Sequence, residues 1–322
     1  MTDTIRRVAV VPPELAGQRL DQVAASLFPE FSRSRLQSWI QSGALVADGA
    51  VLRTRDKIRS GVELRLEATP EPVDSSWQAE ARPLAIVHED DDLLVVNKPA
   101  GLVVHPAAGH REGTLLNALL HHCPVLESIP RAGIVHRLDK DTTGLMVVAK
   151  NLTAQHRLVA QLQARTVHRQ YDAVVAGVLT GGGRVDAPMG RHPRDRKRMA
   201  VLEHGGKPAV THYRVQSRFR GHSHITCLLE TGRTHQIRVH MAHLRYPLVG
   251  DPVYGGRPRP PAGALPELVT ALQEFPRQAL HARRLELVHP ASGEPVAWEV
   301  ALPEDMVALL AALRADVEAS EG

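Results

Sequence analysis

The stretch HRLDKDTTGLMVVAK, residues 136–150, holds the side chains best suited to chemistry. It places two carboxylates, Asp139 and Asp141, beside the cations Arg137 and Lys140. The apolar run LMVVA lies close behind and indicates a buried strand, so these charges stand at the edge of a strand. Two interpretations are open: the charges neutralise one another as a structural ion pair, or one carboxylate takes part in a reaction.

The neighbouring cations limit what these carboxylates can do. Asp139 and Asp141 could bind Mg²⁺ as in a nuclease, but Arg137 and Lys140 would repel a divalent cation. Positive charge beside a carboxylate instead favours its ionised form. An ionised and oriented carboxylate in a cleft is a candidate nucleophile.

The sequence lacks the signatures of cofactor-dependent chemistry. It contains no GxxxxGK[ST], no GxGxxG after a strand, no HExxH, no CxxC and no GxSxG. His235, His240 and His243 do not match a common zinc spacing, and no nearby Cys or carboxylate completes a ligand set. We therefore expect neither a metal nor another cofactor.

The elements that position the charged stretch fall into two regions. Residues 17–67 indicate a small α/β domain, with helical spacing in GQRLDQVAASLFPE and SRSRLQSWIQSG. A hairpin is predicted in ALVADGAVL around Asp48-Gly49, and an alternating strand in GVELRLE. Residues 68–82 are rich in Pro, Ser and Glu without a period and predict a linker.

From residue 83 the chain carries many strands and few helices. LAIVHEDDDLLVVNKPAGLVVHP predicts three strands, and further strands are predicted at GIV, LMVVA, QYDAVVAGVL, HITCLLETG and THQIRVHM. Helices are predicted at GTLLNALLHHC, NLTAQHRLVAQLQAR and EDMVALLAALRADVEASEG. This order indicates an α+β fold, with a mostly antiparallel mixed sheet over residues 83–310. Residues 311–322 are expected to form an acidic C-terminal tail.

Charge is unevenly distributed along the chain, whose net charge is +4. Residues 33–65 hold seven Lys/Arg against three Asp/Glu, and residues 184–220 hold ten against three, whereas the segment between 68 and 92 is acidic. Two basic patches favour two contacts with one long anion, such as a nucleic acid, over two solvated faces. The basic run RHPRDRKR, residues 191–198, is a second candidate for RNA contact.

The sequence also bears on location. No run approaches the 18 or more apolar residues of a membrane span, and the polar N-terminal stretch does not resemble a signal peptide. We expect a cytoplasmic, monomeric protein with no membrane partner.

Several blocks resemble a known family. GIVHRLDKDTTGLMVVAK resembles the motif around the catalytic aspartate of the RluA family of pseudouridine synthases. NKPAGLVVHP, RQYDAVVAG, LLETGRTHQIRVHMAHL and PLVGDPVYGG resemble its other blocks in the same order. Residues 17–67 resemble the RNA-binding domain named after ribosomal small-subunit protein four. The resemblance spans about residues 17 to 310.

The resemblance implies roles for individual residues. Asp139 matches the catalytic aspartate, and Arg137 an arginine that enters the space of the flipped base. Tyr171 matches a tyrosine that stacks on the target base and helps move the proton from carbon 5. Arg233 matches the arginine expected to pair with the aspartate and hold it ionised, and Ile237 an apolar residue behind the uracil.

Two further arginines and one departure complete the implied site. Arg33 and Arg35, in the small domain, are expected to bind RNA. Arg169 stands where many family members carry lysine, which keeps the charge but not the shape. Asp141 is read as a structural partner of Lys140, His136 or a backbone amide.

The resemblance implies an enzyme that isomerises uridine to pseudouridine in 23S ribosomal RNA or a precursor of the large ribosomal subunit. Within the family the sequence looks most like the enzyme for the clustered uridines of the helix 69 stem-loop. The base leaves the ribose through nitrogen and rejoins it through carbon 5, which requires no metal, nucleotide or reductant. A transfer-RNA pseudouridine synthase, a catalytically silent RNA-binding ribosome assembly factor and a metal nuclease are the alternatives.

Overall fold

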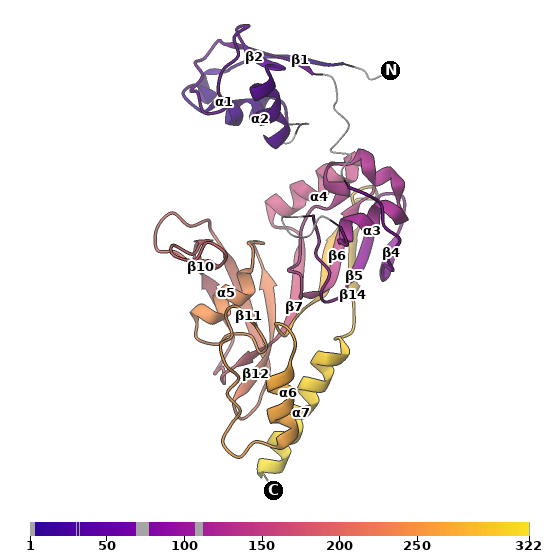
Figure 1. The fold of residues 1–322 in the computed structure, drawn as a ribbon, viewed down its shortest axis with the longest axis vertical. Coiled ribbons are helices and arrows are strands. Elements are labelled where there is room, and N and C mark those ends of the chain that lie inside the picture. Colours follow the sequence, from indigo (N-terminus) through magenta and orange to yellow (C-terminus); the bar gives the residue numbers. More distant parts are fainter. Residues whose placement is uncertain (1–3, 30, 32, 69–76, 107–111, 322) are drawn as a thin grey trace. The chain divides into compact units, whose positions relative to one another are not determined.

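The computed structural model describes residues 4–29, 31, 33–68, 77–106 and 112–321 (Figure 1). The chain divides into two compact units, Met1–Ser75 and Ser76–Gly322. Most of the expected linker, residues 69–76, lies outside the described residues. The segment that follows belongs to the larger unit, because the main chains of Gln78 and Glu80 hydrogen-bond to Asn117.

The smaller unit packs two α-helices on a three-stranded sheet, counted over its described residues. Its elements are β1 (Ile5–Val10), η1 (Pro13–Leu15), α1 (Leu20–Leu27), α2 (Arg33–Ser42), β2 (Leu45–Ala47) and β3 (Glu63–Ala68). The strands pair antiparallel in the order β1-β3-β2. The residues at helical spacing form its core with alternate residues of β3: Leu20, Val23, Ala24, Leu36, Trp39, Ile40, Leu64 and Leu66.

Two features of the smaller unit differ from the sequence-based expectation. The domain begins before the expected residue 17, because β1 pairs along its whole length with β3 and so belongs to the same sheet. Asp48 and Gly49 adopt positive φ angles of 46° and 75° and make the expected turn. The second arm of the predicted hairpin is not a strand, since only an isolated bridge joins Ala47 to Ala50 and β2 pairs with β3 instead.

The larger unit is built on a nine-stranded sheet in the described residues, with the order β4-β5-β6-β13-β7-β12-β11-β8 and β14 paired to β13. The strands are β4 (Ile86–Glu89), β5 (Leu93–Lys98), β6 (Thr143–Ala149), β7 (His168–Ala176), β8 (Gly183–Asp186), β11 (Val210–Arg218), β12 (His222–Leu229), β13 (Leu280–Val288) and β14 (Pro295–Glu299). Among the described residues, the strands of this sheet pair antiparallel except for β13 with β6, which pair parallel. The expected α+β fold with a mostly antiparallel mixed sheet is confirmed.

Helices cover both faces of β5 and β6. Alternate residues of these strands pack toward α3 (Leu115–His122) on one face and α4 (Leu152–Ala164) on the other. This double coverage explains why LLVV and LMVVA read as continuous apolar runs rather than alternating ones. Two 3-10 helices, η2 (Pro124–Ser128) and η3 (Pro130–Gly133), connect α3 to the loop before β6.

The remaining helices lie toward the C-terminal end. α5 (Gln236–His243) follows β12, and α6 (Pro266–Glu274) lies against α7 (Glu304–Glu321) in Figure 1. α6 and α7 bury Leu268, Leu272, Leu309 and Leu313 in one cluster with Val174 of β7. β9 (Met189–Arg191) and β10 (Met199–Val201) form a separate two-stranded hairpin. No described helix has the length and apolar run that crossing a membrane requires.

Three elements were predicted wrongly. THQIRVHM is not a strand, because residues 236–243 form α5. LVVHP is not a strand in its described residues, and GIV contributes only an isolated bridge from Ile134 to Val148. The boundary expected at residue 310 falls inside α7, where Leu310, Leu313 and Asp316 are buried, so residues 311–321 are packed helix.

Gly144 fixes how β6 meets its parallel neighbour. Its φ is +113°, and a Cβ built on it would lie 2.2 Å from the carbonyl oxygen of Ala282 in β13. No side chain fits this crossing, because both the backbone conformation and the contact exclude one. The glycine of the Thr142-Thr143-Gly144 segment therefore sets the distance between β13 and the start of β6.

Candidate active site

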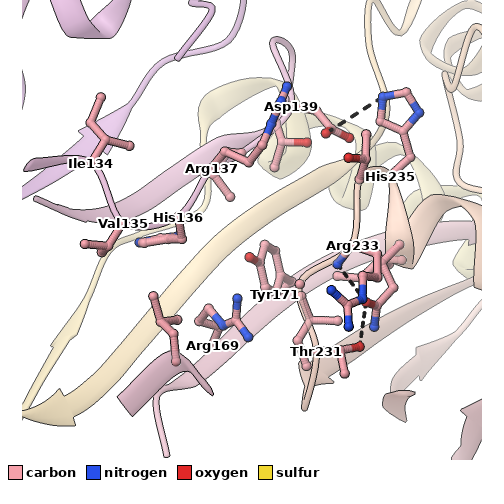
Figure 2. A pocket seen from close by; sticks show the side chains of 18 of the residues that line it. Ile134, Val135, His136, Arg137, Asp139, Arg169, Tyr171, Thr231, Arg233 and His235 are labelled. Atoms are coloured by element: carbon pink, nitrogen blue, oxygen red, sulfur yellow. Dashed lines mark hydrogen bonds and ion pairs between the residues drawn. The ribbon is translucent and has the colours of Figure 1, made fainter. Parts of the chain in front are cut away.

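A pocket of about 870 Å³ opens in the larger unit where the loop before β6 meets β7 and α5. Five residues that the sequence predicted for the site line this pocket: Arg137, Asp139, Tyr171, Arg233 and Ile237. Figure 2 shows Arg137 and Asp139 on the loop, Tyr171 on β7, and Arg233 beside the start of α5. Segments about 30 to 100 residues apart in the sequence thus meet in one cavity.

Asp139 is held at the edge of this pocket by two side chains of the α5 segment. Its Oδ2 accepts a hydrogen bond from Nη1 of Arg238 at 3.0 Å, and its Oδ1 lies 3.9 Å from Nε2 of His235. The Asp139 side chain is 15% exposed, so the carboxylate is reachable from the pocket while it is also anchored. Its anchored and partly exposed position suits a nucleophile.

The expected pairing of Arg233 with Asp139 is wrong, because Arg238 occupies that position. Arg233 is exposed, and its Nε donates to the carbonyl of Pro208 at 3.1 Å. Arg238 is 4% exposed and donates through Nε and Nη2 to the two oxygens of Asp251, at 2.7 and 2.9 Å. One guanidinium therefore joins two carboxylates.

The charges of this network stabilise one another. Burial opposes the charge of Arg238, but the Asp251 and Asp139 carboxylates raise its pKa above the usual range. Burial alone would raise the pKa of Asp251; the guanidinium of Arg238 and the main-chain N–H groups of Tyr254 and Val253 together lower it. A buried ion pair of this kind depends on both partners, since removal of either leaves an unpaired buried charge.

Three side chains hold the loop that carries Asp139. Nζ of Lys98 donates to the carbonyl of Lys140 at 2.8 Å, and also to the carbonyls of Pro99 and Leu102. Nη1 of Arg277 donates to the carbonyl of Asp141 at 3.2 Å, while its Nε and Nη2 bind both oxygens of Asp305. Nε2 of Gln278 donates to the hydroxyl of Thr142 at 3.0 Å.

Lys98 gives a pH-dependent prediction. Burial lowers its pKa to about 7, against the opposing carboxylates of Asp141 and Asp139. Between about pH 7 and 10.5 the unfolded chain binds a proton on this lysine that the folded chain has released, so the free energy of unfolding rises with pH. We expect urea denaturation to show that the free energy of unfolding of wild type rises relative to that of Lys98→Met, by up to about 1.4 kcal/mol per pH unit in this window. Parallel pH profiles for the two proteins would contradict the assignment.

Tyr171 and Ile237 form apolar surface of the pocket. Tyr171 is 5% exposed and Ile237 is 3% exposed, and both belong to the main core cluster of the unit. Burial raises the pKa of the Tyr171 hydroxyl, an effect that the charge of Arg169 reduces. A neutral phenol beside an apolar side chain suits contact with the face of a planar base.

The structure also places the predicted RNA-binding arginines. Arg137 is exposed and lines the pocket. In the smaller unit, Arg33 pairs with the buried Asp21, its Nη2 lying 2.7 Å from the carboxylate. Arg35 lies with its guanidinium carbon 5.6 Å from the centre of the Trp39 ring. Arg33 thus has a structural partner as well as an exposed side chain.

Several site residues were missed by sequence reasoning. Nδ1 of His235 lies 2.9 Å from the hydroxyl of Tyr254, which also accepts the N–H of Met199 in β10. The guanidinium carbons of Arg198 and Arg238 both lie about 5 Å from the centre of the Tyr254 ring. The basic run 191–198 therefore adjoins the site. The block PLVGDPVYGG, which contains Asp251 and Tyr254, was the available signal.

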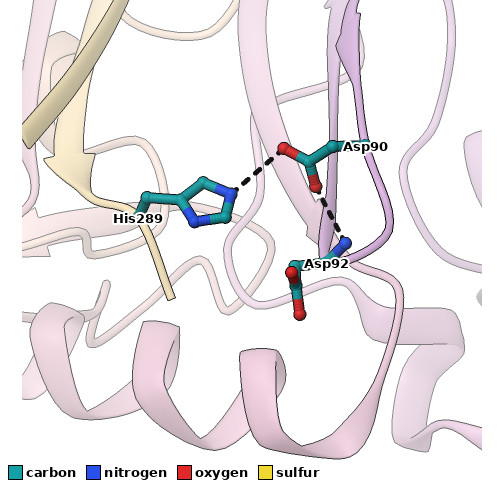
Figure 3. Close-up of side chains that lie close together, drawn as sticks. All are labelled: Asp90, Asp92 and His289. Atoms are coloured by element: carbon teal, nitrogen blue, oxygen red, sulfur yellow. Dashed lines mark hydrogen bonds and ion pairs between the residues drawn. The ribbon is translucent and has the colours of Figure 1, made fainter. Parts of the chain in front are cut away.

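One group outside the pocket has the composition of a metal site. Asp90, Asp92 and His289 bring one ligand atom each within 4.8 Å of one another (Figure 3). Their atoms already have partners: Oδ2 of Asp90 binds Nε2 of His88 at 2.7 Å and of His289 at 3.0 Å, and Oδ1 accepts the N–H groups of Asp92 and Leu93. These contacts hold the turn between β4 and β5 against His289, which directly follows β13.

An anchored carboxylate, a buried tyrosine and exposed arginines on a mostly antiparallel sheet define an enzyme pocket for an anionic substrate. The family model for RNA pseudouridylate synthase matches residues 92–243, a range that contains Asp139, Tyr171 and Arg238. The chain belongs to this RNA pseudouridylate synthase family, of the RluA type, and is an RNA pseudouridine synthase, an isomerase.

Curated relatives resemble the chain over nearly its whole length. Ribosomal large subunit pseudouridine synthase D of Pseudomonas aeruginosa is 63% identical over 322 residues and 100% of both chains. The proteins of the same name from Xanthomonas campestris and Escherichia coli K12 are 56% and 52% identical, over 98% and 99% of this chain and 94% and 97% of theirs.

Solved structures show the same fold at lower identity. Human RNA pseudouridylate synthase domain containing 4 is 30% identical with a TM-score of 0.56, over 71% of this chain and 93% of that chain. Human RNA pseudouridylate synthase domain containing 1 is 26% identical with a TM-score of 0.53, over 74% and 97%. Both are similar in fold to the pseudouridine synthase unit of this protein.

Proposed function

We propose that this enzyme converts specific uridines of the 23S ribosomal RNA into pseudouridine, with the clustered uridines of the helix 69 stem-loop as its target. The observation that carries this proposal is the match to relatives named for the large ribosomal subunit, which extends from end to end of both chains. That match includes the smaller unit with its basic segment 33–65, which lies outside the family model at residues 92–243.

The pocket supports an aspartate-dependent isomerisation. The target base must first leave its stack, at a cost of a few kcal/mol, to enter the pocket. Asp139 is the nucleophile, and Arg238 orients its carboxylate and balances its charge. Tyr171 and Ile237 contact the two sides of the uracil, while the exposed Arg137 fills the space that the base has left. Arg233, displaced from the aspartate, is assigned to the RNA backbone.

The smaller unit supplies a second RNA contact. Arg33 and Arg35 lie on one turn of α2, and Arg33 is 49% exposed at its side chain although it pairs with Asp21. Phosphate contacts release counterions, so we assign much of the affinity for RNA to such cations. The protein is proposed to act as a cytoplasmic monomer without metal or other cofactor.

Tritium release from RNA labelled at carbon 5 of uridine tests the proposal, because isomerisation replaces that hydrogen without changing the mass of unlabelled RNA. Wild type should release tritium from 23S RNA or large-subunit particles in the presence of EDTA, and the modified positions should map to the helix 69 stem-loop. Release from transfer RNA alone would instead favour the transfer-RNA enzyme. Tight RNA binding without release from either RNA would favour an assembly factor.

A further inference from the structure

Arg169 is a buried cation that pairs with no residue described by the structure. Of the three arginines that are buried among the described residues, Arg238 pairs with Asp251 and Asp139, and Arg277 pairs with Asp305. Arg169 is 9% exposed, yet its guanidinium makes no hydrogen bond or ion pair with any described residue, and its Nε is buried without an acceptor. Guanidinium stays protonated in proteins, so no described residue compensates this charge.

The uncompensated charge faces the pocket that holds Asp139. Arg169 lines this pocket and lies two residues before Tyr171 on the same face of β7, as Figure 2 shows. Its charge acts on groups around it: burial raises the pKa of Tyr171 and Arg169 opposes that rise. Burial lowers the pKa of His136 to about 3, and Arg169 adds to that decrease.

The backbone around Arg169 leaves room for its guanidinium. A Cβ on Gly232 would lie 2.6 Å from Nη1 of Arg169, so a side chain at residue 232 would displace the charged group. Burying an unpaired charge costs several kcal/mol, and such groups persist where a ligand completes them. The missing partner of Arg169 is therefore an acceptor carried by the substrate.

We propose that Arg169 is a catalytic residue that donates hydrogen bonds to the uracil of the target nucleotide and stabilises its negative charge during isomerisation. This inference rests on the proposed entry of the target nucleotide into this pocket. Arg169 is buried beside Tyr171 in the wall of the pocket and therefore suits the base, whereas the exposed Arg233 suits a phosphate. Preorganised donors aimed at developing charge are worth more in a water-poor site than in bulk water.

The charge arises at one step of the reaction. When the bond between N1 and C1′ breaks, its electron pair stays on the ring, and the charge spreads over N1 and the carbonyl oxygens. The ring then forms the C5–C1′ bond, loses the proton from C5 and gains one at N1, so atoms and electrons balance without a co-reactant. Arg169 neither gives nor takes a proton; it holds the ring while it is anionic.

Single-turnover pseudouridine formation on saturating large-subunit RNA tests this role. We expect Arg169→Met to lower the rate constant about 10²–10³-fold with RNA affinity changed less than about threefold, and Arg169→Lys to recover part of the loss. Gly232→Ala should also slow the reaction, because it displaces the guanidinium. Arg314→Met, at an exposed arginine of α7 outside the pocket, is the matched control and should react as wild type.

Thermal unfolding separates catalysis from a structural role. Removing an uncompensated buried charge should leave the melting temperature of Arg169→Met equal to or above that of wild type. A lower melting temperature with a proportionate loss of activity would overturn the proposal. The proposal would also be overturned if Arg169→Met weakened RNA binding alone and reduced the salt dependence of that binding by about one unit of slope, because that result marks a phosphate contact. Active wild type with equally active Arg169→Met overturns the role of Arg169 alone; inactive wild type overturns the substrate proposal and this role with it.

Discussion

Asp139→Asn should abolish pseudouridine formation, with a fall in the single-turnover rate constant of at least about 10⁴-fold. An amide oxygen is a far weaker nucleophile than a carboxylate, so the bond-making step is lost. The fold should be kept, because asparagine has the same shape and its Oδ1 can still accept the hydrogen bond from Nη1 of Arg238. Tritium release from 5-labelled uridine in RNA measures the reaction directly.

Asp141→Asn is the matched variant, since it changes the other carboxylate of the same loop. Asp141 does not line the pocket, and the loop is held through its main-chain carbonyl rather than through its side chain. We expect a loss of no more than about tenfold. Full activity of Asp139→Asn, or loss of activity in Asp141→Asn alone, would show that the wrong carboxylate has been assigned.

Arg238→Gln should have the second large effect, on stability as well as on activity. Without the guanidinium, Asp251 is left as a buried charge with two main-chain N–H partners only, and Asp139 loses its cation. Breaking a buried pair by removing one partner costs about 3–5 kcal/mol. Urea denaturation of the larger unit should therefore show a markedly lower midpoint, and single-turnover kinetics a severe loss of rate.

Arg233→Gln is the matched control for stability, because Arg233 is exposed and, among the described residues, its side chain bonds just the carbonyl of Pro208. It should change the free energy of unfolding by no more than about 0.5 kcal/mol. Adding Asp251→Asn to Arg238→Gln removes the unpaired charge and should restore part of the stability but not the activity. Equal destabilisation by Arg233→Gln and Arg238→Gln would contradict the buried network.

The resemblance assigned Arg233 as the pairing arginine, and the element that carries the actual partner, Arg238, was predicted as a strand. Ile237 and Val239 are β-branched and alternate with polar residues, so the stretch from 234 to 241 indicated a strand. In the structure His235 turns through a left-handed conformation at φ 57°, and α5 begins at the next residue. The helix turns Arg238 toward Asp139 and Asp251. Tertiary packing decided this element, because eight residues are too few for propensity to do so.

Other parts of the site were predictable from local pattern. The apolar runs and helical spacings predicted β5, β6, β7, α3 and α4, and the motif blocks brought Asp139 and Tyr171 into one pocket. The supports of the loop were not predictable. Lys98, Arg277 and Asp305 lie far from Asp139 in the sequence, and only the folded sheet brings them together. A single sequence carries no local signal for contacts of that separation.

The position of β13 has a consequence for protein synthesis. β13 lies between β6 and β7 in the sheet, although it is made after both, and Arg277 just before it ties the Asp139 loop to Asp305 of α7. A nascent chain that ends before Leu280–Val288 lacks the strand that separates β6 from β7. It therefore cannot place Asp139 and Tyr171 in one pocket. The smaller unit, proposed above to bind RNA, is translated first and folds before the larger unit is complete, as domains generally do. A ribosome making this protein therefore carries a chain that cannot modify RNA until its last strands and helix have emerged.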